Sequence, residues 1–261
     1  MQKDFAKFVP GTLFEGMTSI RALFEARGNT AVKNDRQILR LYFSVEGERK
    51  IAKELGWLRH RAEEEGFPII PLPCDQIAEM ATGNTHGGLL AECTERTIPR
   101  LVDTTTSLSK DGFYAILEGL EDPYNFGYAL RSLYAAGVDG VVLPERNWMS
   151  AAGVVARASA GASELLPLYT ATSPEAASLF KELGYRIVCA DTRTDLLLPD
   201  ADLKKPIFLI VGGEKRGISR ALLDACDIAV KIPYARPFSA SLSAASAATM
   251  LAYEVMRQNR S

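Results

Sequence analysis

Three short segments of this sequence carry residue types that could hold a small ligand and act on it. These residues are Asn125, Arg131, Gly212, Gly213, Glu214, Ser241, Leu242 and Ser243. An amide, a guanidinium, a carboxylate and a hydroxyl can orient a reacting group through hydrogen bonds. Paired glycines let a ligand approach bare backbone. Together they suggest a site that aligns a reacting group beside a tightly held small molecule.

The segment around the paired glycines indicates what kind of ligand fits. An apolar run at 207–211 is typical of a buried strand, and it breaks into a turn at Gly212. The spacing from Gly212 to Gly217 is that of a phosphate-binding P-loop, but Ile218 stands where the lysine must be. The dinucleotide fingerprint is absent because Gly212 and Gly213 are adjacent. The turn therefore favours a ligand other than a polyphosphate.

Short apolar strands alternate with helices from residue 112 onward. This pattern predicts an α/β domain with a parallel sheet covered by helices on both faces. The predicted strands are 113–117, 140–143, 165–168, 186–190, 207–211 and 228–232, and the predicted helices are 125–136, 150–160, 174–183, 219–225 and a last one ending near 258. Ligands bind at the carboxyl edge of such a sheet, where the three segments are expected to meet.

The preceding part reads as a small α/β unit of its own. Its predicted helices are 16–27, 48–65 and 75–81, and its predicted strands lie within 36–43, 68–72 and 89–93. Residues 94–109 are rich in threonine and serine without a clear period, so a linker is expected there. The predicted division is a first domain at 1–108 and a second at 109–261.

Composition describes an ordinary globular protein. The 261 residues carry a formal net charge of −2, and the isoelectric point is about 5.9, which argues against a generally cationic surface. The four cysteines form no Cys-x-x-Cys pair, so neither a zinc site nor a disulfide framework is expected. No apolar run is long enough for a membrane span and the first ten residues lack a signal-peptide core, so the expected location is the cytoplasm.

Three motifs occur in a fixed order in the second domain. They are Asp-Pro-x-Asn-x-Gly-x-x-x-Arg at 122–131, Gly-x-Glu-x-x-Gly at 212–217, and Ile-Pro at 232–233 followed by Ser-Leu at 241–242 and an alanine-rich helix. This set resembles the SpoU (TrmH-like) branch of the SPOUT RNA methyltransferases. The first domain resembles the L30e-like RNA-binding domain of many members, with Glu15-Gly16 and His86-Gly87-Gly88 as weaker matches.

The resemblance implies a fold, a reaction and partners. Members transfer a methyl group from S-adenosylmethionine to a ribose 2′-hydroxyl of rRNA or tRNA, act as homodimers, and have a deep C-terminal trefoil knot. The separate first domain favours rRNA by analogy. The implied cofactor-binding residues are Gly212, Gly213, Ile232, Leu242 and Ser243, and the implied catalytic residues are Asn125, Arg131, Glu214 and Ser241.

Methyl transfer from a sulfonium needs alignment and proton removal, and no metal. His60 and His86 are the only histidines, and both lie outside the second domain. Arginine stays protonated, so Arg131 is expected to grip the adjacent phosphate and stabilise the developing alkoxide, and the base is left open.

Other interpretations remain open at this stage. Ser241 could simply cap the last helix, Glu214 could be a carboxylate favoured near a helix N-terminus, and the basic side chains of the first domain could be solvated. Members have asparagine where this chain has Ser243. That departure motivates an alternative, a catalytically impaired RNA-binding protein on the same fold. An ordinary nucleotide-binding enzyme is a third hypothesis, disfavoured by the two failed fingerprints.

Overall fold

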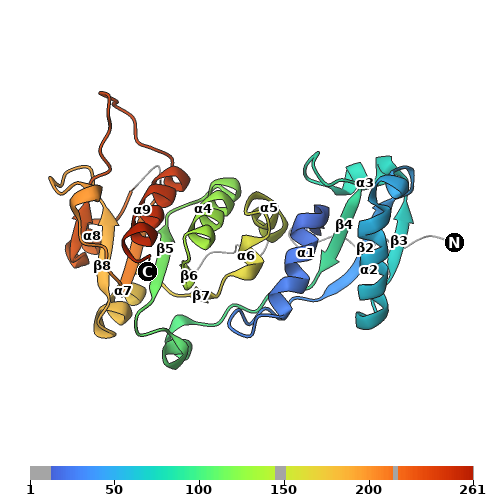
Figure 1. Ribbon diagram of the computed structural model, residues 1–261, viewed down its shortest axis with the longest axis horizontal. Coiled ribbons are helices and arrows are strands. Elements are labelled where there is room, and N and C mark those ends of the chain that lie inside the picture. Colours follow the sequence, from blue (N-terminus) through green and yellow to red (C-terminus); the bar gives the residue numbers. More distant parts are fainter. Residues whose placement is uncertain (1–12, 145–150, 214–216, 261) are drawn as a thin grey trace. The chain divides into compact units, whose positions relative to one another are not determined.

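The computed structural model describes residues 13–144, 151–213 and 217–260, which form two compact units (Figure 1). The first unit runs to Thr97 and also contains helices α5 (Ala152–Ala158) and α6 (Ala162–Leu165). The second unit holds the rest of the described chain. Each unit has its own sheet and its own buried apolar core.

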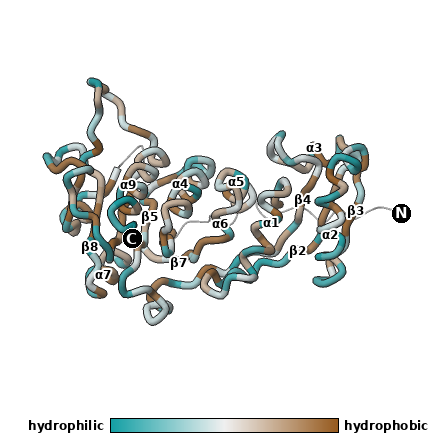
Figure 2. The backbone as a smooth tube through the Cα atoms, in the orientation of Figure 1, coloured by the Kyte–Doolittle hydropathy of each residue, from teal (hydrophilic) through white to brown (hydrophobic). Residues whose placement is uncertain are grey.

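The second unit is built on a six-stranded sheet. Its strands are β5 (Phe113–Glu118), β6 (Gly140–Leu143), β7 (Leu168–Thr170), β8 (Arg186–Ala190), β9 (Ile207–Gly212) and β10 (Ile228–Val230). Their order across the sheet is β10-β8-β9-β5-β6-β7, and every neighbouring pair is parallel. The strands are the strongly hydrophobic segments in Figure 2. The central pair, β5 and β9, consists of buried apolar residues up to the last position of each strand.

Helices cover both faces of this sheet. They are α4 (Pro123–Ala135), α7 (Ser173–Glu182), α8 (Arg220–Ala225) and α9 (Ala244–Gln258), with short 3-10 helices at Leu101–Ser107 and Leu198–Asp200. Phe180 of α7 stacks on Phe208 of β9 with ring centroids 4.3 Å apart, in a core that Leu222 of α8 shares. On the other face α4 packs against α9, and α9 packs against β9. The predicted helix-covered parallel sheet is confirmed.

The first unit has a four-stranded mixed sheet in the order β1-β4-β2-β3. Its elements are β1 (Leu13–Glu15), α1 (Gly16–Arg27), β2 (Ile38–Ser44), a 3-10 helix (Val45–Ile51), α2 (Ala52–Glu65), β3 (Ile69–Leu72), α3 (Cys74–Met80) and β4 (Leu89–Cys93). β4 pairs antiparallel with β1 and β2, and β3 pairs parallel with β2. An L30e-like RNA-binding role for this unit stays a prediction.

The largest differences from the predicted element boundaries concern one helix and one strand. The helix predicted at 48–65 is α-helical only from Ala52, because a 3-10 helix without buried residues precedes it. The strand predicted at 165–168 is β7, Leu168–Thr170, and Leu165 ends α6. A short apolar run does not distinguish a buried helix end from a strand.

Helices α5 and α6 pack against α1 and β1 of the first unit. At Gly153 a Cβ atom would lie 1.9 Å from the carbonyl oxygen of Leu13, so only glycine permits this approach. The Arg157 guanidinium is paired with the Glu15 carboxylate, which also accepts a hydrogen bond of 2.6 Å from the Thr82 N–H. These contacts attach a segment that follows β6 in the chain to the first sheet.

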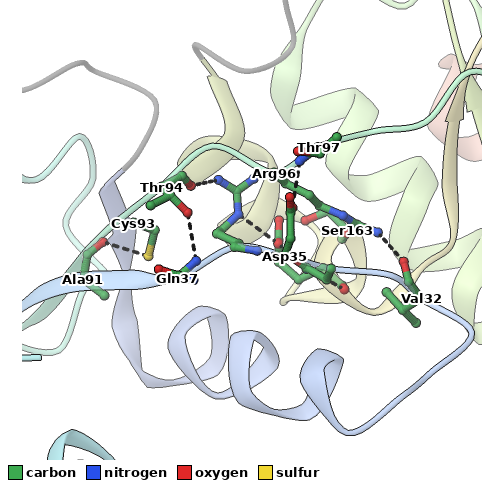
Figure 3. Close-up of polar contacts among 12 residues, drawn as sticks. Val32, Asp35, Gln37, Ala91, Cys93, Thr94, Arg96, Thr97 and Ser163 are labelled. Carbon is green, nitrogen blue, oxygen red and sulfur yellow. Dashed lines mark hydrogen bonds and ion pairs between the residues drawn. The ribbon is translucent and has the colours of Figure 1, made fainter. Parts of the chain in front are cut away.

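A buried ion pair holds α6. Arg36 Nε donates to Glu164 Oε2 at 3.1 Å, and both side chains are only 4% exposed. Figure 3 shows the neighbouring contacts, in which the Arg96 guanidinium donates to the carbonyl oxygens of Val32 at 3.0 Å and Ser163 at 2.9 Å. Because an unpaired charge is costly to bury, these contacts fix α6 on the first unit.

The two compact units therefore differ from the division predicted at 108/109. Leu101 is buried in the core of the second unit, so the 3-10 helix inside the expected linker belongs to that unit. Conversely, Glu164 belongs to the first unit through Arg36. The functional roles assigned to the two domains stay predictions. Within the described ranges, no helix is both long and apolar enough to cross a membrane.

Candidate methyl-donor pocket and reaction centre

A cavity of about 470 Å³ lies at the carboxyl edge of β8, β9 and β10. It is lined by residues 190–193, 211–213, 217–218, Leu223, Val230, Ile232, Tyr234, 241–242, Ala244 and Ala247. A cavity of this size is typical of sites for small organic ligands. The edge position is where parallel sheets bind them.

The floor of the cavity is backbone at the end of β9. Gly212 pairs with Glu118 at the end of β5. A Cβ atom at Gly213 would lie 2.3 Å from the carbonyl oxygen of Gly119, so a side chain at Gly213 would force the two turns apart. Glycine at this position lets the turn after β9 lie directly against the turn after β5. A ligand in the cavity therefore meets peptide groups at close range.

The cavity wall combines apolar and polar surfaces. Ile232 and Leu242 come from the two ends of the loop between β10 and α9, and Leu223 comes from α8. Asp191 follows β8, and Arg193 Nε and Nη2 each donate to one of its carboxylate oxygens at 3.0 Å. These hydrogen bonds hold the pKa of the Asp191 carboxyl below its usual range. The wall thus offers an apolar slot with one fixed carboxylate at its edge.

The loop between β10 and α9 contains two serines of the predicted site, Ser241 and Ser243. Ser241 lines the cavity and is exposed. Ser243 is the N-cap of α9, where its Oγ accepts a hydrogen bond of 3.1 Å from the Ser246 N–H. The capping role considered for Ser241 therefore belongs to Ser243.

Helix α4 begins beside this edge of the sheet. Asp122 is its N-cap and accepts a hydrogen bond of 2.7 Å from the Asn125 N–H. Asn125 is half-buried in the first turn, and Arg131 is exposed further along the helix. With the described residues, Arg131 forms no hydrogen bond or ion pair. Its guanidinium is therefore available to a bound anion.

A comparison with known protein families matches the part of the chain that contains this cavity. The profile of the SpoU rRNA Methylase family matches residues 112–253, more than half of the chain. The chain belongs to the SpoU rRNA methylase family. The "Putative TrmH family tRNA/rRNA methyltransferase YacO" of Bacillus subtilis is 31% identical, over 87% of this chain and 91% of that protein.

One further relative and one solved structure are similar to this SpoU-family chain. The "23S rRNA (guanosine-2'-O-)-methyltransferase RlmB" of Shewanella oneidensis is 34% identical over 71% of this chain and 76% of its own length. The solved SpoU methyltransferase AviRb of Streptomyces viridochromogenes, described in complex with AdoMet, superimposes with a TM-score of 0.74. It is 24% identical and covers 94% of this chain and 89% of its own. The suspected SpoU/TrmH-like membership is confirmed.

The structure brings together many of the residues predicted for the SpoU-type site. Gly212, Gly213, Ile232, Leu242 and Ser241 all line one cavity. Glu214 lies outside the described residues. Ser243, Asn125 and Arg131 are not among the described residues that line the cavity. The functional role of each residue stays a prediction.

Sequence reasoning missed most of the other residues of the cavity wall, and two of them, Asp191 and Tyr234, matter for the site. Asp191 directly follows β8, so the rule that ligands bind beyond the carboxyl ends of parallel strands could have singled it out. Tyr234 had no comparable signal, because its position depends on how the loop after β10 folds back. In the described part of the chain, no three His, Cys, Asp or Glu side chains are grouped as metal ligands would be.

Proposed function

We propose that this SpoU-family chain transfers a methyl group from S-adenosylmethionine to a ribose 2′-hydroxyl of RNA, and that rRNA is its substrate in preference to tRNA. The observation that carries the proposal is the convergence of Gly212, Gly213, Ile232, Leu242 and Ser241 on one cavity. These residues come from two motifs that the resemblance assigns to the cofactor and the reaction centre. The Streptomyces AviRb structure with AdoMet and the Shewanella 23S rRNA enzyme support the donor and the substrate class.

The residues of the cavity fit this donor. Apolar side chains such as Ile232, Leu242 and Leu223 suit the face of a purine ring, and the peptide groups around Gly212 suit its polar edge. The Asp191 carboxylate accepts hydrogen bonds, which suits ribose hydroxyls. When bound, S-adenosylmethionine supplies an activated methyl group on a sulfonium, so the protein's task is alignment.

The reaction centre is proposed at the side of the cavity that faces α4. Arg131 carries a permanent positive charge in a planar fork, which suits an RNA phosphate and a developing alkoxide. Asn125 and Ser241 supply an amide and a hydroxyl that orient the ribose. Arg131 therefore acts in electrostatic stabilisation and positioning, since a guanidinium that stays protonated is a poor base.

Two properties of the family are part of the proposal. The chain segment through β9, α8, β10 and α9 is proposed to form the trefoil knot. The chain is also proposed to act as a homodimer through the α4–α9 face, which is the exposed surface of these two helices around Tyr128 and Tyr253. That face exposes Tyr128 to 49% and Tyr253 to 56% of their surface, a large apolar exposure for two packed helices.

The proposal is tested in two steps with the full chain. Calorimetric titration with S-adenosylhomocysteine should show binding, with ATP and NAD as controls that do not bind. Transcripts of 16S and 23S rRNA and a tRNA pool are then incubated with tritiated S-adenosylmethionine, and labelled RNA is digested to nucleosides. A 2′-O-methylated nucleoside from rRNA supports the proposal. Label on a base, label on tRNA alone, or binding of ATP or NAD alone would overturn it.

A further inference from the structure

The loop between β10 and α9 presents two aromatic rings to solvent. Tyr234 is 41% and Phe238 is 61% exposed, and Phe238 is the most exposed large apolar side chain among the described residues. The two ring centroids lie 6.1 Å apart with an interplanar angle of 55°. Figure 1 shows the segment entering α9 extending away from the helices of its unit. Such a pair contributes nothing to the core, so its exposure calls for another explanation.

Tyr234 connects the ring pair to the cavity. Tyr234 lines the cavity, and its hydroxyl accepts a hydrogen bond of 3.2 Å from the Leu242 N–H at the far end of the loop. Pro233 and Pro237 restrict the backbone before and after Tyr234. The Tyr234 ring is therefore held at the cavity before a ligand arrives, which lowers the entropy lost on binding.

A cation stands between the rings in the sequence. Arg236 is exposed and forms no hydrogen bond or ion pair with the described part of the chain. Lys231, at the start of the same loop, is also exposed. Aromatic faces next to available cations match the chemistry of an unpaired nucleotide, whose base stacks and whose phosphate accepts from a guanidinium. A duplex does not offer its base faces in this way.

We propose that Tyr234, Phe238 and Arg236 form a stacking platform for an unpaired RNA nucleotide at or next to the methylated one. The inference rests on the proposed function and deepens it, because it assigns the substrate class to single-stranded loops and bulges of RNA. Phe238 supplies the exposed stacking face, Tyr234 joins that face to the cavity, and Arg236 holds the neighbouring phosphate.

The test compares Phe238→Ala with Phe238→Trp, which restores an aromatic face, and with Val102→Ala as a control. Val102 is 54% exposed and lies on the 3-10 helix at Leu101–Ser107, far along the chain from the loop. Fluorescence anisotropy measures binding of the full-length protein to a labelled single-stranded RNA and to a blunt RNA duplex. Calorimetry with S-adenosylhomocysteine and sedimentation velocity are run on each variant.

Phe238→Ala should weaken single-stranded RNA binding by about 5- to 150-fold, the range for losing one stacked base. Duplex binding and S-adenosylhomocysteine affinity should change less than about twofold, and Phe238→Trp and Val102→Ala should match the wild type. Equal losses on both RNAs, no loss, or no RNA binding by the wild type would overturn the platform. A change of oligomeric state in Phe238→Ala would assign the rings to an interface between copies instead.

The failure of the platform and the failure of the proposed function have different signatures. If the wild type methylates ribose and Phe238→Ala binds and methylates normally, the function stands and the platform is wrong. If single-stranded binding depends on Phe238 but ribose methylation is never detected, the platform stands and the proposed reaction is wrong.

Discussion

The backbone N–H of Leu242 donates a hydrogen bond of 3.2 Å to the hydroxyl of Tyr234. This contact joins the two ends of the loop between β10 and α9, and both residues line the cavity at the sheet edge. The shape of the cavity therefore depends on how this loop closes as well as on the turn after β9. Substitutions of the loop and α9 residues that line the cavity should therefore change ligand affinity without unfolding the sheet.

Removing the Arg131 guanidinium should separate catalysis from donor binding. Arg131→Ala is expected to lower methylation by about 100-fold or more, the effect of losing one group that stabilises developing charge. S-adenosylhomocysteine affinity should stay within about twofold in calorimetry, because Arg131 is not among the described residues that line the cavity. Arg220→Ala is the matched control, since Arg220 is an exposed arginine that pairs on the surface with Asp224. Unchanged turnover in Arg131→Ala would remove Arg131 from the reaction centre.

Filling the cavity from α9 should block the donor. Ala247 lines the cavity, so Ala247→Leu places a larger side chain into the space that S-adenosylmethionine is proposed to occupy. We expect S-adenosylhomocysteine affinity to fall about tenfold or more, a loss of about 1.4 kcal/mol or greater. Ala221→Leu, at an exposed position of α8, should leave affinity unchanged. Equal affinities in the two variants, measured by calorimetry on folded protein, would place the donor elsewhere.

The N-cap of α9 should tolerate asparagine and not alanine. Ser243 Oγ accepts from the Ser246 N–H at 3.1 Å, and asparagine caps helices as well as serine does. Ser243→Ala should cost about 1 kcal/mol, which lowers the calorimetric Tm of the second unit by about 2–4 °C. Ser243→Asn should keep the wild-type Tm. If Ser243→Asn instead created methylation in an inactive wild type, the impaired RNA-binding alternative would replace the proposed function.

Breaking the buried ion pair should loosen α6 from the first unit. Glu164→Ala leaves the buried Arg36 guanidinium without its carboxylate, at a cost of about 3–5 kcal/mol. Hydrogen exchange followed by mass spectrometry should show faster exchange in α1, α5 and α6. The control is Glu65→Ala, which removes the partner of Arg27. This ion pair is more exposed than the Arg36–Glu164 pair, so its loss should cost at most about 1 kcal/mol. Equal exchange in the two variants would show that burial of the pair adds nothing.

Charge on the α4–α9 face should separate the proposed dimer. Tyr128→Glu and Tyr253→Glu each place a carboxylate on an exposed aromatic position of that face, and burying it unpaired against a second copy is unfavourable. Sedimentation velocity at micromolar concentration should show a dimer for the wild type and a monomer for both variants. Leu183→Glu, at an exposed position after α7, should remain dimeric. A monomeric wild type would refute the homodimer.

Local patterns were sufficient for most elements of the second unit. The continuous apolar runs of β5 and β9 indicated strands buried on both faces, because such runs are too short for buried helices and end in glycine-containing turns. The helix predicted at 125–136 is α4, which begins two residues earlier, at Pro123. The order of three motifs, together with the edge rule for parallel sheets, was enough to predict that Gly212 and Ile232 lie near each other.

Other features depended on contacts between residues distant in the sequence. Arg36 and Glu164 are separated by 128 positions, so no local period could indicate that α6 belongs to the first unit. The capping of α9 by Ser243 and the return of Tyr234 to the cavity depend on the path of one loop, which several serines and two prolines could have followed differently. The sequence by itself determined most of the strands and helices and the family, because these follow from local apolar patterns and short motifs. Only the tertiary structure decided which side chains enter the cavity and which helices attach to which sheet, because those choices depend on packing across the whole chain.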